Sequence, residues 1–181
     1  SRNGSSVNSI LSITGPASDL TLFTDEELRA AVGVTDSSQD DALTALGKRV
    51  AARIAAVCNI ATDGVTPRTL RQETLTETFR SRYRWPGFGY SIRPHHEGEN
   101  LILARRPIAS VASITEDGVA LDPTSDYEIL SGSGMLRRLT ERAGVPMPWW
   151  WFAAEIVVVY DAGWAVVPDD LKRAAEILVR A

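Results

Sequence analysis

The run MPWWWFAAEIVVVYDAGW, residues 147–164, constrains the fold more than any other part of the chain. Three adjacent tryptophans, Trp149, Trp150 and Trp151, precede an apolar segment, and Trp164 ends the run. Successive residues of a strand point to opposite faces, so three adjacent indoles cannot all enter one small core. Some of this aromatic surface is therefore expected to meet a partner. The alternative is that Trp149 and Trp151 pack under a sheet while Trp150 caps a loop.

The apolar segment within this run predicts a strand in the middle of a sheet. Ile156, Val158 and Tyr160 face one way, and Val157 and Val159 face the other. Both faces are apolar, so the strand has to lie centrally or be covered on both sides.

Local signals predict three helices. Thr24 and Glu27 have capping-box spacing, and Gly33 supplies a stop signal. Farther along, apolar residues recur every three or four positions, which predicts one long amphipathic helix. Near the end, Pro168 and the acids after it mark the first turn of another helix. The predicted helices span about residues 24–32, 38–58 and 168–181.

Between the second and third helices the pattern changes to strands and turns. Residues 69–85, TLRQETLTETFRSRYRW, have a two-residue rhythm that is typical of a strand, but of one too polar to be central. Asp117 and Gly118 stand between apolar runs, which is a strong hairpin signal. The β-rich part is predicted to cover about residues 69–165.

Together these elements predict an α+β chain. Two N-terminal helices and one C-terminal helix would form a small helical bundle, with a long antiparallel β-rich insertion between them. Residues 1–20 are rich in Ser, Gly and Asn and are predicted to be a flexible segment. Residues 21–181 are predicted to form a single domain.

Composition narrows the class of protein. The formal net charge is −4, from 19 basic and 23 acidic residues, which does not favour a surface that grips nucleic acid throughout. Cys58 is the only cysteine, so an intrachain disulfide is excluded. No apolar run reaches the roughly 20 residues that span a bilayer, and the start of the chain lacks the layout of a signal peptide. We therefore expect a soluble protein, intracellular when made, with no membrane contact.

Residues that could carry catalysis are scarce. His95, His96 and Glu97 form the one cluster of metal-ligand types, but their spacing matches no defined zinc signature. The sequence holds no G-x-S-x-G elbow, P-loop or G-x-G-x-x-G motif. We therefore expect no enzyme, no cofactor and no metal. A metal-dependent activity centred on His95 and His96 remains as an alternative.

Charge is divided unevenly along the chain. Residues 68–106 hold eight arginines and four acids, whereas residues 107–167 hold three arginines and eight acids. Aromatic residues alternate with the arginines between positions 71 and 93, which is compatible with stacking on single-stranded nucleic acid. Contact between the basic part of one subunit and the acidic part of the next is a second interpretation, and a solvated face is a third.

The order of several motifs resembles a known family. The motifs are RPIASVASI at residues 106–114, the turn Asp117-Gly118, the pair Asp126-Tyr127, and VVYDAGWAVVPDDLK at residues 158–172. In this order, and with two helices before them, they resemble the head-tail connector, or adaptor, family of tailed phages and of phage-derived gene transfer particles. The resemblance covers most of the chain from about Leu22 onward.

That resemblance implies a structural protein of a phage or phage-like particle. In this family, copies of the protein form a ring, typically of twelve, beneath the portal protein. The ring extends the DNA channel, lets double-stranded DNA pass without sequence-specific binding, and docks the next head-completion or tail protein. Assembly would take place in the host cytoplasm, and the final place would be the head-tail junction of the virion. A nucleic-acid-binding module that uses residues 71–93 is the alternative function.

A ring subunit needs surface for its neighbours, so tryptophans left over after core packing are candidates for that contact. The long insertion, with its polar first strand, predicts an arm that reaches over an adjacent subunit. The basic and aromatic stretch supplies further candidates. The candidate interface residues are Trp149, Trp150, Trp151, Trp164, Arg80, Arg82, Arg84 and Trp85.

Overall fold

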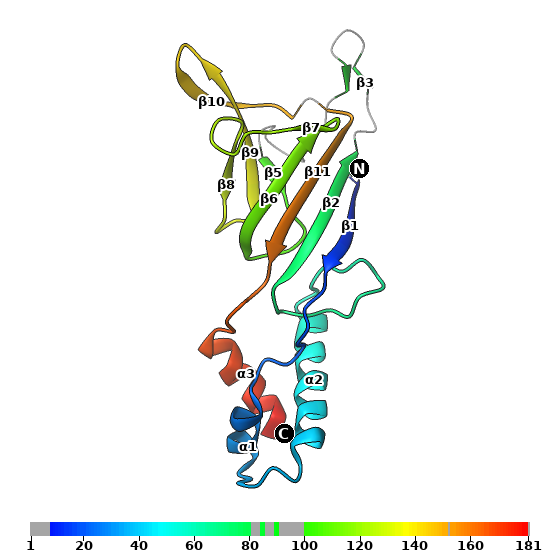
Figure 1. The fold of residues 1–181 in the computed structure, drawn as a ribbon, viewed down its shortest axis with the longest axis vertical. Helices are drawn as coiled ribbons and strands as arrows, with labels where there is room; N and C mark the ends of the chain where they lie inside the picture. Colours follow the sequence, from blue (N-terminus) through cyan, green and yellow to red (C-terminus); the bar gives the residue numbers. More distant parts are fainter. Residues whose placement is uncertain (1–7, 81–83, 86–88, 91–99, 152, 181) are drawn as a thin grey trace, which may run out of the picture.

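The structure is a computed structural model that describes residues 8–80, 84–85, 89–90, 100–151 and 153–180. It is elongated, with helices at one end and strands at the other (Figure 1). The α+β fold expected from the sequence is confirmed. In chain order the elements are β1 (Asn8–Gly15), α1 (Asp25–Val32), α2 (Asp40–Val57), β2 (Glu73–Arg80), β3 (Arg84–Trp85), β4 (Gly89–Tyr90), β5 (Asn100–Ile102), β6 (Ile108–Glu116), β7 (Val119–Ala120), β8 (Tyr127–Leu130), β9 (Met135–Arg142), β10 (Val145–Trp149), β11 (Glu155–Ala162) and α3 (Asp169–Arg180).

The helices form a small bundle with a hydrophobic core of its own. The Oγ1 atom of Thr24 accepts a hydrogen bond from the Glu27 N–H at 3.2 Å, and the Glu27 carboxylate accepts one from the Thr24 N–H at 2.8 Å. This capping box starts α1, and Gly33 ends it in the left-handed region with a φ of 76°. Both signals were read from the sequence, and the helix bounds agree with their predictions to within two residues. The buried side chains of this core include Leu22, Leu28, Leu43, Val50, Val167, Ala175 and Val179.

The larger sheet is antiparallel and has the strand order β1-β2-β11-β6-β7. The predicted central strand is β11, which pairs with β2 on one side and β6 on the other. The predicted hairpin turn at Asp117 and Gly118 joins β6 to β7, with φ angles of 48° and 83°. Both predictions are therefore confirmed.

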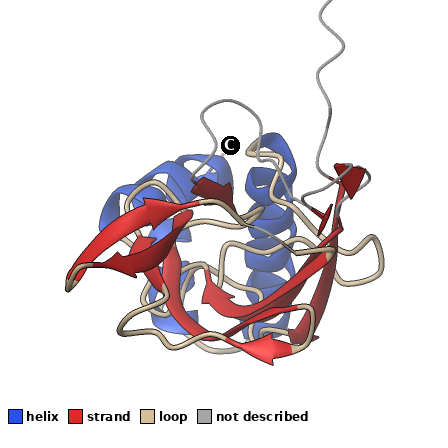
Figure 2. Cartoon of the chain, turned by 90° about the horizontal axis from the view of Figure 1, so that it is seen from above, coloured by secondary structure: helices blue, strands red, loops and turns tan. Residues whose placement is uncertain are grey.

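A second sheet packs against one face of the larger one. Its strand β9 pairs with β10, β5 and β8. Seen along the long axis in Figure 2, the strands lie in front of the helices. Buried side chains from both sheets form the second core, which includes Leu75, Phe79, Leu101, Leu103, Tyr127, Leu136, Trp151, Ile156, Val158 and Tyr160. In the described part of the chain, no helix has the length and apolar character needed to cross a bilayer.

The start of the chain corrects one prediction. Residues 1–20 were predicted to be flexible, but Asn8–Gly15 form the edge strand β1, antiparallel to β2. Leu11 and Ile13 pack against the core, while Ser12 between them is exposed. This two-residue alternation is a strand signal that the high Ser and Asn content obscured.

The position of the strand β2 corrects a second prediction. It was predicted to be too polar for a central position, yet it lies between β1 and β11 and pairs with both. Its polar character on the inner face comes from two glutamates that have buried partners elsewhere in the chain, described below. The residues of β2 that face the core are Glu73, Leu75, Glu77 and Phe79.

Candidate assembly interface

The tip of the hairpin β9–β10 is an exposed part of the described β-rich end. We call residues 141–150 the arm, and all of them are exposed. Ala143 and Gly144 form its turn with φ angles of 54° and 78°, the conformation of a tight two-residue hairpin. Figure 1 shows β10 projecting from the rest of the molecule at the upper left. The arm is therefore surface that another molecule can reach.

The arm carries large apolar side chains into solvent. Val145 is 57% exposed, Met147 42%, Trp149 47% and Trp150 43%. The first three alternate along β10 and so share one face of the strand. An apolar patch of this kind on a projecting hairpin is typical of a contact surface. Part of the tryptophan surface thus lies outside the core, as the sequence predicted.

Two prolines define the outer edge of the arm. Pro146 pairs with Glu141 and Pro148 with Leu139 in the antiparallel ladder. Proline has no N–H, so these two pairs cannot be hydrogen-bonded pairs, and the missing donors fall on the outward edge of β10. Prolines on an edge strand prevent another strand from pairing there. Any partner of the arm must therefore bind through side chains and not by extending the sheet.

Trp151 behaves differently from its two neighbours. It is 0% exposed and belongs to the core between the sheets. Trp151 therefore offers no surface to a partner, and its inclusion among the interface residues was wrong. Trp149 is exposed, so the alternative that placed it under the sheet together with Trp151 was also wrong. The strand β10 ends at Trp149. The side chains of Trp150 and Trp151 therefore need not alternate between the two faces of the sheet.

Trp164 lies apart from the arm, in the connection between β11 and α3. Its side chain is 37% exposed. Its backbone N–H donates to the Leu70 carbonyl at 2.9 Å, and its carbonyl accepts from the Gln72 N–H at 3.1 Å. Trp164 lines a hollow of about 490 Å³ together with residues that include Asp19, Arg71, Glu73 and Asp161. The structure thus does not bring Trp164 together with Trp149 and Trp150.

The candidates between residues 80 and 85 lie at the end of β2 and in the segment after it. Arg80 lies on the surface at the end of β2, where its Nε atom contacts a Glu155 carboxylate oxygen at 2.7 Å. Arg84 and Trp85 form β3, which pairs with β4. Arg82 lies outside the described residues.

The nucleic-acid alternative for residues 71–93 loses part of its support. Phe79, one of the aromatic residues considered for base stacking, is only 4% exposed and lies in the core. Arg71 contacts the Asp19 carboxylate at 3.1 Å and donates from Nε to the Thr21 carbonyl at 2.6 Å. Side chains engaged in this way within the fold do not form a free platform for bases.

Buried polar groups fix the helical end to the sheets. Arg105 is 2% exposed, and its guanidinium contacts a Glu73 carboxylate oxygen at 3.1 Å. The same guanidinium donates to the carbonyls of Ala61 and Thr69, each at 3.0 Å. Both carbonyls belong to the loop between α2 and β2, so Arg105 ties this loop to the core. Buried charges persist in folded proteins when they are paired and hydrogen-bonded in this way.

Glu77 is a second buried acid on β2, but its described contacts are not with a base. It accepts hydrogen bonds from the Tyr160 hydroxyl at 3.0 Å, from the Ala104 N–H at 2.9 Å and from the side chain of Ser9. Burial raises the pKa of Glu77 above its ordinary value and outweighs these hydrogen bonds, which lower it. The contacts join β1, β2 and β11 with the loop after β5.

Replacing Glu77 with glutamine is expected to change how stability depends on pH. Because the pKa of Glu77 is raised by folding, the native state binds the proton more tightly than the unfolded state. Its contribution to stability is therefore fully present below the unfolded pKa and is lost as the pH rises through the raised pKa. The stability of Glu77→Gln relative to the natural chain should thus increase as the pH rises above about pH 4.5, the ordinary pKa of a glutamate side chain.

Urea denaturation at several pH values measures this difference. The matched control is Glu128→Gln, at an exposed position on β8, whose stability relative to the natural chain should show no such rise. If the difference in stability between Glu77→Gln and the natural chain did not change with pH, the Glu77 carboxyl would not be buried in solution.

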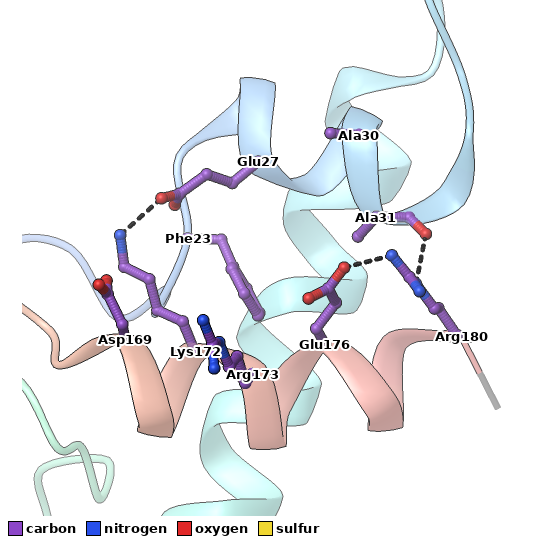
Figure 3. Close-up of a pocket in the computed structure, with 9 residues that line it drawn as sticks. All are labelled: Phe23, Glu27, Ala30, Ala31, Asp169, Lys172, Arg173, Glu176 and Arg180. Atoms are coloured by element: carbon purple, nitrogen blue, oxygen red, sulfur yellow. Dashed lines mark hydrogen bonds and ion pairs between the residues drawn. The ribbon is translucent and has the colours of Figure 1, made fainter.

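A hollow of about 370 Å³ lies between α1 and α3 (Figure 3). On one side Lys172 Nζ contacts the Glu27 carboxylate at 2.6 Å, and this hydrogen bond lowers the pKa of Glu27. On the other side Arg180 donates to the Ala31 carbonyl at 2.9 Å and pairs with Glu176. These charged groups are engaged with one another, so the hollow belongs to the contact between the two helices.

Metal-ligating groups give no site in the described residues. No three or more His, Cys, Asp or Glu side chains among them could hold a metal ion together. The cluster His95, His96 and Glu97, which the sequence singled out, lies outside the described residues.

The fold has a counterpart among solved structures. A chain in the neck of a native gene transfer agent particle, computed with C12 symmetry, aligns with a TM-score of 0.54 and 17% sequence identity. The alignment covers 93% of this chain and 80% of that chain. At this identity the likeness concerns the fold alone. No protein-family model matches this chain, and no curated protein matches it.

Proposed function

We propose that this protein is a head-tail connector of a tailed phage or phage-like particle. The observation that carries the proposal is the projecting arm, with Trp149 47% and Trp150 43% exposed and with every residue of its tip exposed. A surface of this kind suits a subunit that is completed by its neighbours. The fold shared with a particle-neck chain supports the same role, as does the order of motifs that resembles the connector family.

In the proposed role, copies of the chain form a ring beneath a portal protein. Twelve copies agree with the family resemblance and with the C12 symmetry of the neck that holds the structural counterpart. The ring would extend the DNA channel and present a docking surface for the next head-completion or tail protein. A net charge of −4 suits a channel through which duplex DNA slides without being gripped. The role is structural and needs no catalysis.

The arm is expected to control assembly. Trp149→Ala combined with Trp150→Ala should weaken self-association by at least about tenfold, because buried aromatic anchors dominate the binding energy of interfaces. Light scattering over a concentration range, alone and with the portal protein of the same particle, measures the effect. Val65→Ala is the control, because Val65 is a 90% exposed apolar residue outside the arm.

Two results would contradict the proposal. One is a natural chain that stays monomeric at every concentration and does not bind the portal protein. The other is a double variant that assembles as well as the Val65→Ala control does.

A further inference from the structure

The larger sheet has an outer face that is uncharged at its centre. We define this outer face by two rows of side chains that lie across neighbouring strands in register. One row joins Ile10, Thr78, Val157 and Thr115, and the other joins Ser12, Thr76, Val159 and Ser113. Residues directly opposite one another in an antiparallel sheet share a face, so these eight form one surface. The inner face of the same strands carries the buried core residues.

No described element covers this outer face. The second sheet packs on the inner face, and the helices lie beyond one end of the strands (Figure 1). Ile10 is 57% exposed, and Ser12 and Ser113 are exposed as well. The solvated face of an antiparallel sheet is usually polar, and this face places Ile10, Val157 and Val159 among uncharged Thr and Ser side chains.

Among the described residues of these strands, the charged side chains on this surface stand at its two ends. The ion pair between Arg80 and Glu155 follows the row that contains Ile10. Asp161, which accepts hydrogen bonds from Thr74 and Ser110, follows the row that contains Ser12. An uncharged centre between polar ends is the arrangement of a protein-protein interface, because burying its centre desolvates no charge.

The arm and the outer face lie on different sides of one molecule. The arm leaves at the upper left of Figure 1, whereas β1, which carries Ile10 and Ser12, forms the opposite edge. A ring with cyclic symmetry is built from two different patches, each of which meets its complement on the next copy. One chain supplies two such patches, and neither is covered by its own described residues.

We propose that the arm of one copy lies across the outer face of the next copy, an inference that rests on the ring proposed above. Val145, Met147 and Trp149 supply an apolar strip on one face of β10. The outer face supplies small and β-branched side chains to receive it. Because Pro146 and Pro148 block strand pairing at the arm's edge, the contact is face to face through side chains.

Disulfide trapping tests this contact. Cys58, the only cysteine and an exposed one, is first replaced by serine. One single-cysteine chain then carries Met147→Cys on the arm, and a second, of different tagged mass, carries Ser12→Cys on the outer face. The two are mixed under assembling conditions and oxidised, and mixed disulfides are separated by mass. The control replaces Ser12→Cys by Val57→Cys, a 71% exposed position on α2 in the helical bundle.

The expected result is a mixed disulfide between the Met147→Cys and Ser12→Cys chains in clear excess over the Val57→Cys control. Particles that assemble without this excess would overturn the arm contact and leave the proposed ring intact. Chains that never assemble, alone or with the portal protein, would overturn both.

A charge substitution gives an independent readout. Ser12→Arg places a charge at the centre of the outer face and is expected to weaken self-association by at least about tenfold. Ser37→Arg, at an exposed position in the connection between α1 and α2, is the matched control and should leave association unchanged. Both variants should keep the thermal stability of the natural chain. Equal association of the two variants would contradict the proposed contact.

Discussion

Replacing Arg105 with alanine is expected to lower the free energy of unfolding by about 3–5 kcal/mol. The change leaves the carboxylate of Glu73, itself 1% exposed, without its charged partner. It also removes the donor that binds the carbonyls of Ala61 and Thr69. Small domains are stable by only about 5–15 kcal/mol in total, so this single change removes a large fraction.

Urea denaturation of the full chain measures this loss. Arg49→Ala, at an exposed position on α2, is the control and should change stability by less than about 0.5 kcal/mol. Combining Glu73→Gln with Arg105→Met should be less harmful than Arg105→Ala, because no lone charge remains buried. If Arg105→Ala matched Arg49→Ala, the ion pair would not be buried in solution.

Trp151→Ala is expected to cost about 3–5 kcal/mol of stability, because it leaves a cavity in the core between the two sheets. Trp150→Ala, one position earlier in the sequence, should cost less than about 1 kcal/mol, because its side chain is 43% exposed. The comparison isolates burial, since both variants delete the same indole.

A further variant refines the test. Trp151 Nε1–H is buried with no hydrogen-bond partner among the described residues. Trp151→Phe keeps an aromatic ring and removes this N–H, so it should be much less destabilising than Trp151→Ala. Thermal denaturation of Trp151→Ala, Trp151→Phe and Trp150→Ala gives the order of their stabilities. Equal losses for Trp150→Ala and Trp151→Ala would contradict the core described above.

Local signals in the sequence were sufficient for the elements whose causes are local. The capping box at Thr24 and Glu27 and the turn at Asp117 and Gly118 each depend on residues a few positions apart. The two-faced apolar run of β11 likewise required a central position. These features were therefore predicted with nearly correct bounds.

Features that depend on distant residues were missed. The central place of β2 depends on Arg105 and Tyr160, which bind its glutamates from 32 and 83 positions away. Nothing near Glu73 and Glu77 in sequence marks these partners, so polarity was taken as a sign of an edge. The edge strand β1 was missed because its apolar alternation is short and set among Ser and Asn.

The candidate site was predicted in part for the same reason. The excess of tryptophan surface was apparent from three adjacent indoles, but which of them is buried depends on where β10 ends. The outer face could not be identified from sequence, because its two rows come from strands far apart in the chain. Only the register of the sheet brings them together.

The rotational symmetry of particles formed by the purified full chain tests the central claim most directly. Electron microscopy of the assembled protein, alone or bound to its portal protein, should show closed rings whose top views share one cyclic symmetry. Monomers under every condition, or open filaments with no closed ring, would contradict the account.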